Sequence, residues 1–94
     1  MTRQMLESIL GRAGCTSEDG RFVLPEGRTL TLYLAREGAS LQVSRVVEVV
    51  SRENMVEALD HKGELFMLAL EDLFAASVTG DTRTGPLRKA GFLG

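Results

Sequence analysis

Few side chains in this 94-residue sequence could carry out catalysis or bind a metal ion. His61 is the only histidine and Cys15 the only cysteine. A serine, threonine or cysteine nucleophile needs a neighbouring base, and we expect His61 in an exposed turn, where we assign it no role. One histidine and one cysteine also give no zinc-binding spacing. We therefore predict no catalytic and no metal-binding residues, and a structural role for Cys15.

Two other patterns fall short of a chemical site. Gly80 and Gly85 have the separation of a phosphate-binding loop, but Pro86-Leu87 stands where the loop needs Lys followed by Ser or Thr. The carboxylates of Glu71 and Asp72 are adjacent in sequence, so they point in different directions in a strand or a helical turn and form no acid/base pair. We predict that the chain binds no cofactor and is not an enzyme.

Apolar and basic side chains near the two ends of the chain suit the recognition of another protein. Residues 79–94 contain four glycines, one proline and three basic side chains, a composition that is typical of a flexible basic tail. Large apolar side chains flank a basic pair in this tail and could anchor in a partner's groove. The candidate partner-binding residues are Leu6, Leu10, Leu87, Arg88, Lys89, Phe92 and Leu93.

An amphipathic helix must position Leu6 and Leu10. Over residues 2–13, apolar side chains recur on one face at helical spacing. Thr2 can cap the start of the helix, and Gly14 suits the left-handed position beyond its end. The apolar face could pack on the rest of the domain or serve as a docking face for another protein.

Composition and charge set the broad class of the protein. Hydrophobic residues make up 44% and charged residues 26% of the chain, which is ordinary for one small globular domain. We expect a cytoplasmic protein that does not enter a membrane, because no apolar run is long enough to span a bilayer and no signal peptide is visible. Residues 51–80 carry two basic and six acidic side chains, whereas residues 81–94 carry three and one. The acidic body disfavours nucleic acid as a partner.

The central part of the chain predicts a strongly bent β-sheet. Residues 29–35 alternate leucines with Thr, Tyr and Ala, the period of a half-buried strand. Residues 40–50 begin with the same alternation, with Leu41 and Val43 inside, and then become apolar on both faces. Arg45 lies where the phase changes, which predicts a bulge. Further short strands are predicted over residues 21–24, 55–59, 65–70 and 75–78.

We thus predict a mainly β fold, a small bent five- to six-stranded antiparallel barrel with an N-terminal amphipathic helix. Its parts are residues 1–14 for the helix, 15–78 for the barrel and 79–94 for the tail. An α+β alternative remains open, because Ser51 could cap a helix and residues 64–77 are rich in helix-forming residues. That alternative has a three-stranded sheet and two C-terminal helices.

The hydrophobic pattern of residues 28–78 resembles the Sm and Hfq class of bent five-stranded barrels that follow a helix. The resemblance is carried by Leu32-Tyr33-Leu34, Gly38, Leu41-Gln42, Val47-Glu48-Val49 and the hairpin at Asp60 to Gly63. It implies ring assembly through edge strands and RNA binding near a pore. Val43-Ser44 replaces the family's glycine, and Leu70-Glu71-Asp72 replaces its basic motif. These differences weaken the expectation of RNA binding more than the expectation of ring assembly.

A second comparison, with cyclic-dinucleotide-binding barrels of the PilZ type, fails because their arginine pair and their Asp or Asn, Ser, Gly motif are not in place.

We therefore predict a non-enzymatic interaction or adaptor module. It binds another protein and forms a homo-oligomer, with the tail or the helix docking to the partner. The alternative is an oligomer that gathers several basic tails to bind RNA or single-stranded nucleic acid.

Overall fold

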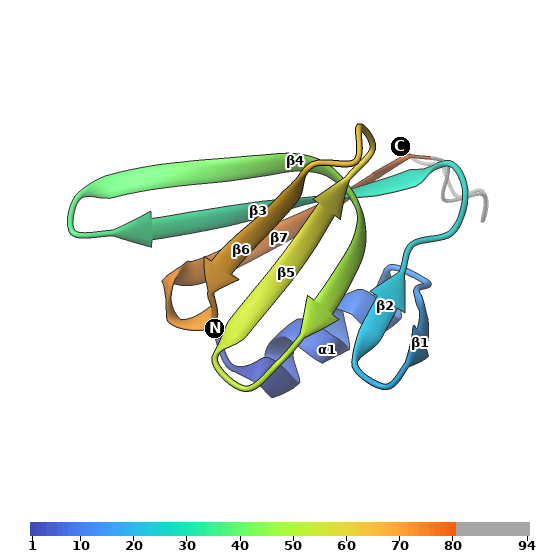
Figure 1. Ribbon diagram of the computed structural model, residues 1–94, viewed down its shortest axis with the longest axis horizontal. Coiled ribbons are helices and arrows are strands. Elements are labelled where there is room, and N and C mark those ends of the chain that lie inside the picture. Colours follow the sequence, from blue (N-terminus) through green and yellow to red (C-terminus); the bar gives the residue numbers. More distant parts are fainter. Residues whose placement is uncertain (81–94) are drawn as a thin grey trace, which may run out of the picture.

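The computed structural model describes residues 1–80, and these form one helix and a curled antiparallel sheet (Figure 1). The elements in chain order are α1 (Arg3–Arg12), β1 (Thr16–Glu18), β2 (Arg21–Val23), β3 (Arg28–Arg36), β4 (Ala39–Ser51), β5 (Met55–Asp60), β6 (Leu65–Ala69), the 3-10 turn η1 (Leu70–Asp72) and β7 (Leu73–Gly80). The mainly β prediction is confirmed. The α+β alternative is wrong, because residues 55–80 are strands apart from η1 and the short turns.

The helix α1 packs against the sheet. The Met5 backbone N–H donates to Thr2 Oγ1 at 3.1 Å, so Thr2 is the predicted cap. Leu6 and Leu10 lie four residues apart on one helix face, and both side chains are completely buried. Figure 1 shows α1 beneath the curled sheet, beside the β1–β2 hairpin. Of the two sequence-based interpretations of this face, packing on the domain is the one that the structure shows.

The strand order leaves the sheet open on one side. The order is β1-β2-β4-β3-β7, and β5 joins the other edge of β4 and carries β6. Among residues 1–80, β6 pairs only with β5 and β7 pairs only with β3. The sheet therefore curls into a half-barrel and does not close through a β6–β7 ladder. It has one strand more than predicted, because residues 16–18, for which no strand was predicted, pair with β2.

A bulge at Arg45 produces much of the bend. Arg45 has a φ of 56°, a left-handed conformation that few non-glycine residues adopt. Leu30 pairs with Val46 and Leu32 with Val43, so β4 has one residue more than β3 over this interval. An extra residue in one strand increases the local twist and bends the strand. The predicted bulge is confirmed, and it allows β4 to belong to both halves of the curled sheet.

The core lies between the concave face of the sheet and α1. The period-two pattern of β3 directs its leucines inward, where they meet the helix and the inner residues of the other strands. The buried core residues are Leu6, Leu10, Ala13, Leu24, Leu30, Leu32, Leu34, Val43, Val46, Val49, Val56, Ala58, Leu70 and Leu73. Leucine and valine dominate this core, as the scarcity of aromatic residues implies.

The last strand extends further than predicted. β7 continues to Gly80, two residues beyond the expected end at Val78. Gly80 has a φ of 123°, and a Cβ atom there would collide with the carbonyl oxygen of Gly27. Glycine is therefore needed where β7 ends beside β3. The first two residues of the predicted tail, residues 79–94, thus belong to β7, and the others lie outside the described residues.

Candidate interaction site

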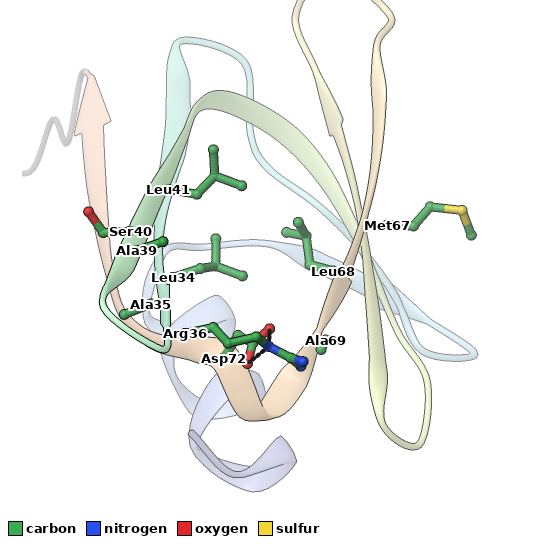
Figure 2. Close-up of a pocket in the computed structure, with 10 residues that line it drawn as sticks. All are labelled: Leu34, Ala35, Arg36, Ala39, Ser40, Leu41, Met67, Leu68, Ala69 and Asp72. Atoms are coloured by element: carbon green, nitrogen blue, oxygen red, sulfur yellow. Dashed lines mark hydrogen bonds and ion pairs between the residues drawn. The ribbon is translucent and has the colours of Figure 1, made fainter.

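An apolar groove lies on the open side of the half-barrel. It runs between the tip of the β3–β4 hairpin and strand β6 with the turn η1, and its volume is about 230 Å³. Figure 2 shows the side chains of Leu34, Leu41 and Leu68 extending into this space from opposite walls. We call it the open-side groove and define it by these three leucines together with Arg36 and Asp72 at one end.

The pairing pattern explains why the groove is open. Leu34 and Leu41 are partners across the β3–β4 hairpin, and both face the concave side. Strand β5 pairs with β4 only from Val46 onward, so no strand covers the beginning of β4. Leu34 is buried, but Leu41 is 53% exposed. The alternation of β4 correctly placed Leu41 on the inner face but did not predict its exposure.

Unpaired strand edges border the groove. Among the described residues, β6 has no partner on the side opposite β5, and residues 39–45 of β4 have no partner on the side opposite β3. The backbone N–H and C=O groups along such edges can pair with an extended segment of another chain. The groove thus offers both apolar side chains and backbone hydrogen-bonding groups.

An ion-pair cluster closes the hairpin end of the groove. Arg36 Nε donates to Asp72 Oδ2 at 2.9 Å and to Oδ1 at 3.0 Å, and Arg36 Nη2 donates to Glu71 Oε2 at 3.3 Å. The hydrogen bond to Asp72, followed by its negative charge, raises the pKa of Arg36. Because this guanidinium is exposed, solvent screens the pair and its contribution to stability is small. Its main effect is to hold the hairpin tip beside η1.

A second apolar surface lies on the convex side of β5 and β6. Met55, Leu65 and Met67 are exposed there, and Met67 points away from the open-side groove in Figure 2. Glu57 lies among them, paired with Met67 across the strands. The Glu57 carboxylate accepts a hydrogen bond from Arg52 Nε at 2.9 Å. Strand β6 therefore carries apolar side chains on both of its faces.

Neither of the sequence-predicted partner-binding residues within residues 1–80 lines this groove. Leu6 and Leu10 were predicted as docking residues, and in the folded chain both side chains are fully buried against the sheet. Leu87, Arg88, Lys89, Phe92 and Leu93 lie outside the described residues. Sequence reasoning missed Leu68 and Met67 as surface-forming residues, because a continuous apolar run such as that at residues 65–70 is typical of a central strand.

The residues with reactive or ligating side chains are dispersed. Burial raises the pKa of the Cys15 thiol, which disfavours the reactive thiolate. His61 is exposed in the turn after β5. The Asp60 carboxylate accepts hydrogen bonds from the backbone N–H groups of Lys62 and Glu64, both at 2.9 Å. No group of three or more His, Cys, Asp or Glu side chains within residues 1–80 is arranged to hold a metal ion.

Comparisons of the chain with protein-family models, with curated proteins and with solved structures found no match. Within the part of the chain that the structure describes, no helix is long and apolar enough to cross a membrane. The geometry of the open-side groove is therefore the main guide to function.

Proposed function

We propose that this chain is a non-enzymatic protein–protein interaction module that self-associates through the open side of its half-barrel. The observation that carries the proposal is the open-side groove, where three leucine side chains, one of them the exposed Leu41, lie between two unpaired strand edges. Small strand-edge surfaces of this kind bind extended segments, with the backbone supplying affinity and the side-chain pockets supplying specificity.

The energetics favour an extended apolar segment over a small molecule as the ligand. The groove volume of about 230 Å³ is below the roughly 300–1,000 Å³ of most small-molecule sites. Covering a large aliphatic side chain fully is worth about 1.5–3 kcal/mol, so covering the exposed half of Leu41 contributes about half as much. Hydrogen bonds along β6 would add to this contribution only if the ligand is extended.

The test is a substitution at the exposed leucine in the groove. Leu41→Lys places a charge where the segment must bind, and the side chain can extend into solvent, so the domain should stay folded. We expect self-association, measured by size-exclusion chromatography with light scattering across a concentration series, to weaken by at least about tenfold. Self-association that is unchanged by Leu41→Lys would overturn the proposal, as would a wild-type chain that stays monomeric throughout.

A matched control is available on the helix α1, outside the groove. Met5 on α1 is 56% exposed, close to the 53% of Leu41, and it does not line the groove. Met5→Lys therefore adds the same charge at equal exposure and should leave self-association at the wild-type level. An equal loss in both variants would point to net charge as the cause.

The nucleic-acid alternative has one supporting observation, a small basic corner. The His61 backbone N–H donates to the Arg45 carbonyl at 3.0 Å, which brings Arg45, His61 and Lys62 to the same end of the sheet. Binding of a labelled single-stranded oligonucleotide that falls steeply with salt and is lost in Arg45→Asn, which removes the charge and tolerates the positive φ, would support this alternative. The acidic excess of the described residues opposes it.

A further inference from the structure

We infer that the open-side groove binds residues 87–93 of a second copy of the chain. The inference rests on the proposed function and names the partner segment. It links two features that lie apart in the sequence: an apolar groove with an acidic end, and a short segment in which apolar side chains flank a basic pair.

The charges of the groove and of the segment are complementary. At the hairpin end of the groove, Glu37, Glu71 and Asp72 supply three carboxylates against the single cation of Arg36. This leaves a local charge of −2, from 1 − 3. Arg88 and Lys89 would supply two positive charges. Residues 1–80 as a whole have 8 basic and 12 acidic side chains, a net −4, and residues 81–94 have 3 and 1, a net +2.

The apolar side chains also correspond. The groove presents Leu34, Leu41 and Leu68 behind its charged end. Leu87 directly precedes the basic pair, and Phe92 and Leu93 follow it by three and four residues. When Arg88 and Lys89 lie at the carboxylates, the apolar residues that precede or follow this pair can lie along the three leucines of the groove. The backbone of the segment then runs beside β6.

The length of the chain argues for a second copy over the same copy. β7 leads away from the groove, because Leu73 pairs with Leu34 whereas Gly80 pairs with Arg28. The seven residue steps between Leu73 and Gly80 correspond to about 23 Å at about 3.3 Å per residue. The seven steps from Gly80 to Leu87 span at most about 25 Å. Almost no length remains for the turn that would bring Leu87 back to its own groove.

A mixing experiment with full-length chains tests this inference. One variant, Leu41→Lys, has a damaged groove and an intact C-terminal segment. The other, Arg88→Glu with Lys89→Glu and Phe92→Ser, has an intact groove and a damaged segment. We expect each variant alone to associate at least about tenfold more weakly than the wild type. Their equimolar mixture should form a heterodimer, because one chain supplies the segment and the other supplies the groove.

A charge-reversal pair adds specificity to the test. Glu37→Lys with Glu71→Lys should weaken self-association, and so should Arg88→Glu with Lys89→Glu. Mixing these two variants should restore association, because opposite charges again face each other. Asp72 is left unchanged so that its ion pair with Arg36 continues to hold the hairpin tip.

The outcomes separate the inference from the proposed function. If the segment variant associates like the wild type while Leu41→Lys does not, the groove binds another segment and the inference is wrong. If neither variant differs from the wild type, both proposals fail. Weakened single variants whose mixtures stay monomeric would also overturn the inference. The wild-type chain could also be monomeric at every concentration while its Leu41 NMR signals differ from those of the segment variant. That result would show that the segment binds the groove of its own copy, and the inference of a second copy would be wrong.

Discussion

At the scale of single residues, Asp60 shows how one side chain organises a turn. Its carboxylate accepts backbone hydrogen bonds from Glu64 and Lys62, in that order of effect, and these bonds lower the pKa of Asp60. A carboxyl group whose pKa is lowered in the folded state stabilises that state above its unfolded pKa, near 3.9. The contribution is lost as the pH falls through the lower pKa of the folded state.

We therefore expect Asp60→Ala to lower the free energy of unfolding at neutral pH, with a difference from the wild type that shrinks below about pH 4. Asp60→Asn keeps an oxygen acceptor without the charge, so it should be less damaging at neutral pH and its cost should depend less on pH. Urea denaturation followed by circular dichroism at several pH values measures both. A difference between Asp60→Ala and the wild type that stays constant into strong acid would contradict this explanation.

At the scale of elements, the helix α1 contributes side chains to the core. Leu6 and Leu10 are completely buried, whereas Met5 next to them is exposed. We expect Leu6→Ala and Leu10→Ala each to lower the free energy of unfolding by about 2–5 kcal/mol. Met5→Ala should change it by less than about 0.5 kcal/mol. If all three substitutions cost the same in urea denaturation, the helix would not be packed as described.

The bulged strand is the second element that shapes the molecule. Arg45 is held at positive φ in the middle of β4, where a β-branched side chain is strongly disfavoured. Arg45→Val should therefore cost about 1–3 kcal/mol of stability. Arg45→Asn should cost much less, because asparagine tolerates this conformation. Equal stability of the two variants in urea would place the bend of β4 elsewhere.

At the scale of the whole molecule, stability should be graded from the centre of the sheet to its open side. β3 is paired on both sides, with β4 and β7, whereas β6 is paired only with β5. Hydrogen exchange should therefore be slowest at the backbone N–H groups of Leu30 and Leu32 and fast along the free edge of β6. Raising the protein concentration should slow exchange along that edge, and Leu41→Lys should remove this protection. Protection that appears elsewhere would move the interface away from the groove.

The sequence alone was enough to predict the parts of the fold that depend on local patterns. The alternation in residues 29–35 identified β3 and its buried face, and Thr2 identified the start of α1. Arg45 was identified because the apolar phase changes there. Each of these signals is contained within a few consecutive residues, so no knowledge of distant contacts was needed.

The openness of the sheet was decided only by the tertiary structure. Leu41 and Val43 have the same pattern in sequence, but Val43 is buried whereas Leu41, nearer the hairpin tip, is exposed. The apolar run of β6 likewise reads as a central strand, although no partner lies on its outer side among the described residues. Residue types along one strand determine which side chains face the core. Which strand lies next to them depends on the bend at Arg45 and on how far each neighbour extends, so the groove exists only in the folded chain.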